Sequence, residues 1–85
     1  MQNFPQISKN QVALIRVDVN TGHVLDENYQ IALDNKQNVY SIFETLEDAV
    51  LYSQKVLIEK KGIEVLIYNE KKELLQYISW ESCRI

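Results

Sequence analysis

The segment Ile63-Glu-Val-Leu-Ile-Tyr68 places apolar side chains on both faces of one predicted β-strand. Side chains alternate between the two faces of a sheet along a strand, so Leu66 and Tyr68 point opposite to Val65. The rest of the chain predicts a single helix, and one helix covers only one face of a sheet. The second apolar face must therefore be covered by another part of the chain or by a partner.

The helix is predicted at about residues 46–61. Thr45 has the side chain of a good N-cap residue, and acidic residues follow it in the first turn, where the positive end of the helix dipole favours them. Gly62 is expected to end the helix in a left-handed conformation. The apolar stripe that should pack on the sheet consists of Leu46, Ala49, Val50, Ser53, Val56 and Leu57.

Five segments have the alternation or the apolar content of strands. Their order around the helix is β-β-β-α-β-β, which predicts an α+β fold with a mostly antiparallel sheet of four to five strands and the helix on one face. The first three strands are expected to form an antiparallel meander, and the last two a hairpin. The predicted strands are Gln11–Val19, a segment within His23–Leu33, Val39–Phe43, Ile63–Tyr68 and Leu74–Trp80.

A length of 85 residues predicts one domain, residues 11–85, preceded by an N-terminal arm, residues 1–10, that is flexible unless it packs on the sheet. Hydrophobic residues make up 46% of the chain, but no apolar run reaches the roughly 18 residues that span a bilayer. The start of the chain has neither the basic nor the apolar region of a signal peptide. Cys83 is the only cysteine, so we expect a cytoplasmic protein without an internal disulfide.

The residue types that catalysis or cofactor binding require are sparse. His23 is the only histidine, and the segment from Asp18 to Tyr29 has its glycine one position too early, and tyrosine in place of the final glutamate, for a calcium loop. The two glycines, Gly22 and Gly62, cannot form a phosphate-binding loop. We therefore expect no enzyme activity, no metal and no cofactor.

Protein contact is the function that this pattern favours. The second sheet face, with Leu66, Tyr68 and Leu14, is the first candidate interface, and Leu51 and Ile58 on the outer side of the helix are the second. The strand order decides whether Val12 and Leu14, or Tyr40 and Ile42, join Leu66 and Tyr68 on that face. Three covers for the sheet face stay open: the N-terminal Phe4, Pro5 and Ile7 folding back, a homodimer, or a different protein. We expect a small non-catalytic interaction domain that self-associates through this face.

Nucleic-acid binding is the alternative, through scattered lysines and exposed aromatic rings. The net charge of −3 opposes it overall. Topology also separates Lys60 and Lys61, at the end of the predicted helix, from Lys71 and Lys72 in the closing hairpin. The candidate residues are Lys55, Lys60, Lys61, Lys71 and Lys72 with Tyr40, Tyr68, Tyr77 and Trp80.

Phe43, Thr45 and Ala49, followed by the helix and the apolar strand from Ile63, resemble a pattern in small bacterial domains of unknown function. In that pattern three strands lead through a "Phe-x-Thr-x-x-x-Ala" helix start into a hairpin. The resemblance covers about the last half of the chain and implies the β-β-β-α-β-β order. It supplies no functional residue.

Overall fold

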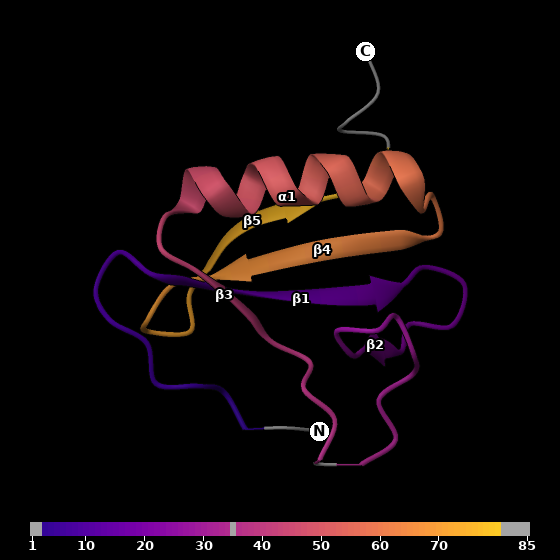
Figure 1. The fold of residues 1–85 in the computed structure, drawn as a ribbon, viewed down its shortest axis with the longest axis horizontal. Coiled ribbons are helices and arrows are strands. Elements are labelled where there is room, and N and C mark those ends of the chain that lie inside the picture. Colours follow the sequence, from indigo (N-terminus) through magenta and orange to yellow (C-terminus); the bar gives the residue numbers. More distant parts are fainter. Residues whose placement is uncertain (1–2, 35, 81–85) are drawn as a thin grey trace.

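The helix α1 lies along one face of an open, five-stranded antiparallel sheet (Figure 1). The structure is a computed structural model that describes residues 3–34 and 36–80. It confirms the α+β class and the predicted order β-β-β-α-β-β. The elements are β1 (Val12–Asp18), β2 (Val24–Leu25), β3 (Ser41–Phe43), α1 (Leu46–Glu59), β4 (Ile63–Tyr68) and β5 (Leu74–Ile78).

The strand β1 is the centre of the sheet. One of its sides pairs with β4 along six residue pairs, and its other side pairs with β3 near its start and with β2 near its end. The strand β5 pairs with the outer side of β4, so it forms an edge of the sheet. The expected meander of the first three strands is wrong, because β3 pairs with β1 and not with β2.

The short β2 explains this difference. Asp26 follows β2, and its carboxylate accepts hydrogen bonds from the backbone N–H groups of Asn28 and Gln30 at 2.8 and 3.0 Å. Tyr29, inside this turn, has a positive φ of 64°. A side chain that satisfies local backbone donors favours a turn over a strand. The region His23–Leu33, in which a strand was predicted, therefore contributes only Val24–Leu25 and a single bridge between Leu25 and Ile31.

The helix begins where it was predicted and ends two residues early. The Thr45 hydroxyl accepts the backbone N–H of Asp48 at 3.1 Å, which is the expected N-cap. The helix ends at Glu59, and Lys60 leaves it with a φ of −131° as the chain enters β4. Gly62 does not have a positive φ, so the expected left-handed glycine cap is wrong.

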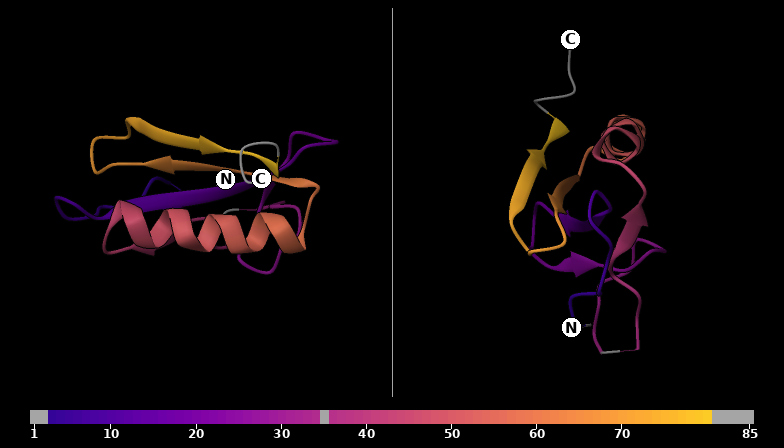
Figure 2. Two further views of the ribbon diagram at one scale, coloured as in Figure 1. Left: turned by 90° about the horizontal axis from the view of Figure 1, so that it is seen from above. Right: turned by 90° about the vertical axis from the view of Figure 1, so that its left-hand side faces the viewer.

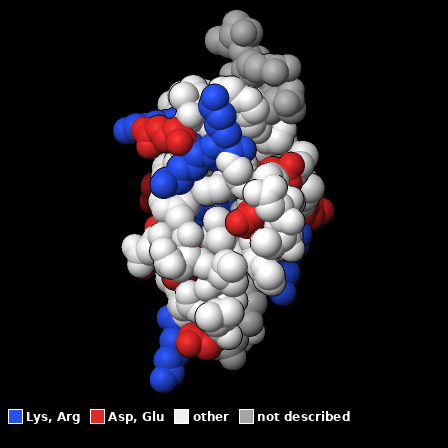
Figure 3. Space-filling view, turned by 90° about the vertical axis from the view of Figure 1, so that its right-hand side faces the viewer, with Lys and Arg blue, Asp and Glu red and all other residues white. Residues whose placement is uncertain are grey.

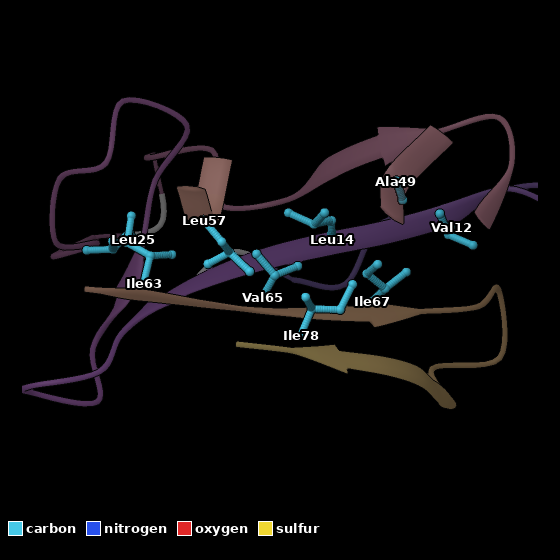
Figure 4. Close-up of a cluster of buried hydrophobic side chains, with 9 residues drawn as sticks. All are labelled: Val12, Leu14, Leu25, Ala49, Leu57, Ile63, Val65, Ile67 and Ile78. Carbon is cyan, nitrogen blue, oxygen red and sulfur yellow. The ribbon is translucent and has the colours of Figure 1, made fainter. Parts of the chain in front are cut away.

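The main core lies between α1 and the sheet (Figure 4). The predicted helix stripe is confirmed: Ala49, Ser53, Val56 and Leu57 are buried, and Leu46 and Val50 pack against the same cluster. The sheet side of this core is formed by Val12, Leu14, Leu25, Ile63, Val65, Ile67 and Ile78.

A second cluster covers the face of the sheet turned away from α1, which we call the far face. The N-terminal arm and the connection between β2 and β3 run on this side, opposite the helix (Figures 1 and 2). Val39 and Tyr40 of the connection are buried against it, and Phe4 and Ile7 of the arm pack there as well. The far face consists of Ala13, Ile15 and Val17 of β1, Val24 of β2, Ile42 of β3, Leu66 and Tyr68 of β4, and Leu74 and Tyr77 of β5.

Candidate protein interface

Leu14 does not lie on the far face. It is fully buried, and it stands opposite Ile67 on the side of the sheet that packs against α1. Ala13 and Ile15 occupy the far-face positions of β1, opposite Tyr68 and Leu66. Assigning Leu14 to the exposed face was wrong because β1 is apolar at successive positions, so its pattern does not determine which set faces the helix.

Leu66 and Tyr68 lie on the far face as predicted, but they are half-buried there. The Phe4 ring stands edge-on to the rings of Tyr40 and Tyr68, with centroids 5.4 and 6.2 Å apart. Of the three possible covers, the chain's own N-terminal arm occupies this part of the face, together with the β2–β3 connection. Burial, with a contribution from Tyr68, raises the pKa of the Tyr40 phenol, as expected for a ring enclosed by this cover.

The far face is left open at its β5 margin. Leu74 is 51% exposed and Tyr77 is 52% exposed, although both stand opposite far-face residues of β4. Leu75 between them is 41% exposed and sits at a β-bulge, where the register with β4 shifts. The sequence prediction missed this surface, although one signal was visible, because Leu74–Ile78 carries no charge.

Leu51 and Ile58 are exposed on α1, at 59% and 56%. They are separated by seven residues, two helical turns, and so lie on one side of the helix, away from the buried stripe. No other large apolar residue of α1 is among the exposed hydrophobic residues that the structure describes. The second candidate interface therefore has two exposed apolar side chains, whereas the β5 margin has three.

Three of the five lysines of the nucleic-acid alternative, Lys60, Lys61 and Lys72, lie against aromatic rings of the protein itself. The Lys60 ammonium is 4.7 Å from the centroid of the Tyr29 ring, and the Lys61 ammonium is 4.7 Å from that of Trp80. Cations over these rings occupy faces on which bases would stack. Figure 3 views the end of the molecule where α1 finishes, and basic and acidic side chains are mixed on it rather than forming one basic surface.

Among the residues that the structure describes, Arg16 is the one buried cation. It is 1% exposed, and its guanidinium donates to the Ser41 hydroxyl at 2.7 Å, the Tyr52 hydroxyl at 3.3 Å and the Val39 carbonyl at 3.2 Å. Its Nε atom has no hydrogen-bond partner in the structure. These bonds join β1 to the entry of β3 and to α1, so Arg16 fixes the position of the β2–β3 connection.

Tyr29 and Tyr52 belong to the same polar network as Arg16. The hydroxyls of Tyr29 and Tyr52 are 3.1 Å apart and share a hydrogen bond. Burial, followed by the hydrogen bond to Tyr52, raises the pKa of Tyr29 to about 12. The Arg16 guanidinium stands 5.9 Å from the centroid of the Tyr29 ring. The group is a satisfied network around a buried cation, apart from the Arg16 Nε atom.

The acidic residues near His23 serve the turns. One Asp18 carboxylate oxygen accepts the backbone N–H groups of Asn20 and Thr21, at 2.8 and 3.3 Å. The Asp26 carboxylate accepts from the Gln37 side chain at 2.8 Å as well as from its own turn, and these bonds lower the pKa of Asp26. Within residues 3–34 and 36–80, no group of three or more potential metal ligands is present.

A pocket of about 240 Å³ opens at the end of β5. Ligand pockets commonly enclose roughly 300–1,000 Å³, so this one is small, and Lys61 lies across its Trp80 wall. The pocket is lined by Val19, Lys61, Ile63, Glu64, Ser79 and Trp80.

None of the described helices is long and apolar enough to cross a membrane.

Comparison with known proteins gives no relative: no protein family, curated protein or solved structure matches the chain. The resemblance of its second half to small bacterial domains of unknown function stays a prediction. Any proposal about function therefore depends on the fold and the surface of this chain alone.

Proposed function

We propose that this chain is a small non-catalytic domain that acts by protein contact and self-associates through the β5 margin of its sheet. The observation that carries the proposal is an uncharged edge strand whose Leu74, Leu75 and Tyr77 side chains are each about half exposed. Native proteins usually protect such an edge with charges or proline, and an unprotected edge favours pairing with another chain.

The cover on the far face supports an interface at the β5 margin rather than over the whole face, which the sequence suggested. Over β1 and β4 the face is closed by Phe4, Ile7, Val39 and Tyr40. On the described strands, the exposed apolar residues that remain on this face are Ile42 of β3, which is 48% exposed opposite Ala13, and Leu74 and Tyr77 of β5. Self-association through Leu66 and Tyr68 would require the arm to move. Association at β5 uses a surface that is already exposed.

The exposed apolar area is sufficient for a weak dimer. A large apolar side chain contributes roughly 1.5–3 kcal/mol when it is fully buried, so burying the exposed halves of three such side chains on each of two copies contributes on the order of 4–9 kcal/mol. Loss of rigid-body freedom costs about 4–15 kcal/mol, and hydrogen bonds between the backbones offset part of it. We therefore expect association at high micromolar rather than nanomolar concentration.

Light scattering over a series of concentrations tests the proposal. The mass should rise from that of the monomer toward twice that value, and Leu74→Asp should keep the protein monomeric. Leu51→Asp is the matched control, because Leu51 has a similar exposure but lies on the outer side of α1. A monomer mass at every concentration would exclude self-association, and a dimer lost in Leu51→Asp but kept in Leu74→Asp would assign the interface to the helix.

A further inference from the structure

The direction of the backbone groups of β5 follows from two hydrogen bonds at the ends of β4. In an antiparallel pair, residues of one strand alternate between those bonded to the neighbour and those directed away from it. The N–H of Val19 donates to the carbonyl of Gly62 at 2.9 Å, so Gly62, Glu64 and Leu66 direct their backbone groups toward β1. The residues between them, including Val65, are directed toward β5.

The other end of β4 gives the same alternation. The N–H of Asn69 donates to the carbonyl of Glu73 at 3.0 Å, so Asn69, Ile67 and Val65 are the residues of β4 that bond to β5. Tyr77 stands opposite Leu66, which is bonded to β1 instead. The backbone N–H and C=O of Tyr77 therefore point away from β4, to the open edge of the sheet.

No strand among residues 3–34 and 36–80 pairs with this edge at Tyr77. The Tyr77 hydroxyl donates to the carboxylate of Glu64, so the side chain leans back across β4 and away from the edge. This hydrogen bond is also the main cause of the raised pKa of the Tyr77 phenol. The helix α1 packs on β1, β3 and β4, and β5 lies beyond it at the margin (Figure 2).

We propose that two copies of this chain pair through β5 in antiparallel orientation, about a two-fold axis beside Tyr77, so that the two sheets become one. Tyr77 of each copy would exchange two backbone hydrogen bonds with Tyr77 of the other. Gln76 would stand opposite Ile78 of the other copy. This inference rests on the proposed function and identifies the partner as a second copy and the contact as a strand edge.

Charge and symmetry favour a second copy in this orientation. β5 carries no charged residue, so pairing it with itself places no like charges opposite each other. The charged turn, Glu70–Glu73, precedes β5, and antiparallel pairing puts the turns of the two copies at opposite ends of the interface. A parallel arrangement would bring Lys71 and Lys72 beside their equivalents. Antiparallel pairing also gives a closed, self-complementary dimer.

Proline at position 77 tests the backbone contact. Tyr77→Pro removes an N–H that the monomer does not use for pairing with β4, and prolines are accepted on edge strands where the N–H faces outward. Tyr77→Ala keeps this N–H but removes the side chain. We expect Tyr77→Pro to weaken dimerisation at least tenfold more than Tyr77→Ala, with both variants retaining the far-ultraviolet circular dichroism of the wild type. Equal dimerisation by the folded variants would overturn the inference.

Cross-linking tests the axis independently of how proline affects folding. A hydrogen-bonded antiparallel pair has Cα atoms about 5.5 Å apart, which suits a disulfide. In a Cys83→Ser background, Tyr77→Cys should therefore form a disulfide-linked dimer under mild oxidation. Leu74→Cys is the control: its two copies would be separated by about six residues along the strand, or roughly 20 Å, and should not cross-link.

The two proposals fail differently. If wild-type protein is monomeric at all concentrations, self-association and the edge contact are both excluded. If wild-type protein is a dimer but Tyr77→Cys cross-links no faster than Leu74→Cys, the protein self-associates through another surface and the edge contact is overturned. Fast cross-linking of Leu51→Cys in the same background would identify that surface as the helix.

Discussion

Replacing Phe4 by alanine should destabilise the domain, because this one side chain closes much of the far face. The Phe4 ring contacts the rings of Tyr40 and Tyr68 edge-on, and the Lys72 ammonium stands 5.6 Å from its centroid. Phe4 also comes from a segment outside the sheet. If the arm is part of the folded domain, removing the Phe4 ring must lower the free energy of unfolding.

The expected loss can be worked out from the burial and the ring contacts. Phe4 is half-buried, which corresponds to roughly 100 Å² of apolar area and about 2 kcal/mol after the retained Cβ is allowed for. Each edge-to-face contact adds about 0.5–1.5 kcal/mol. Residual structure in the unfolded chain reduces such sums, so we expect Phe4→Ala to lower the free energy of unfolding by about 2–3 kcal/mol.

Urea unfolding followed by circular dichroism, at a concentration where the wild type is monomeric, measures this change. Phe4→Leu keeps most of the apolar burial and should lose only about 1 kcal/mol, the contribution of the ring pairs. Leu33→Ala is the negative control, since Leu33 is 85% exposed and its loss should change stability by less than about 0.5 kcal/mol. A Phe4→Ala midpoint equal to that of Leu33→Ala would refute the closure of the far face by the arm.

Three further changes follow from single contacts. Thr45→Ala removes the cap that accepts the N–H of Asp48 and should cost about 1 kcal/mol in urea unfolding, whereas Thr45→Ser should cost less. Arg16→Met loses three hydrogen bonds of about 1 kcal/mol each but also removes the unpaired buried Nε, so it should lower the free energy of unfolding by only about 0–2 kcal/mol. Arg16→Ala also loses the apolar packing of the side chain and should lower it by about 2 kcal/mol more. The pKa of Tyr29 is raised from 10.0 to about 12, so the stability that this shift contributes is complete below pH 10 and is lost as the pH rises from 10 to 12. An ultraviolet titration of the wild type, compared with that of Tyr29→Phe, should show one additional phenol that ionises late. Identical late ionisation in the two proteins would contradict this prediction.

The parts of the fold that follow from local chemistry were predictable. Thr45 could be recognised as a cap, and the spacing of Ala49, Ser53 and Val56 identified the buried side of the helix, because both signals lie within a few residues of each other. The closing hairpin was predictable for the same reason. Its turn, with Lys72 at a φ of 63°, connects two strands that are adjacent in the sequence.

Long-range pairing was not predictable in this way. β1 is apolar at Val12, Ala13, Leu14 and Ile15, so either set of alternate residues satisfied the pattern for the helix side. The choice depends on its register with β4, some fifty residues later. The buried Arg16 had no local signal either, since its partners come from the β2–β3 connection, from β3 and from α1.

The closure of the far face also decides between two ways of self-association. Packing sheet against sheet through Leu66 and Tyr68 would require Phe4 to leave its site, which costs about the 2–3 kcal/mol expected for Phe4→Ala. Pairing at the open edge beside Tyr77 requires no such displacement. The wild type and Phe4→Ala therefore distinguish the two interfaces: removing the arm's ring should strengthen a face-to-face dimer and leave an edge-paired dimer nearly unchanged. An increase in dimerisation of tenfold or more in Phe4→Ala would favour the face over the edge.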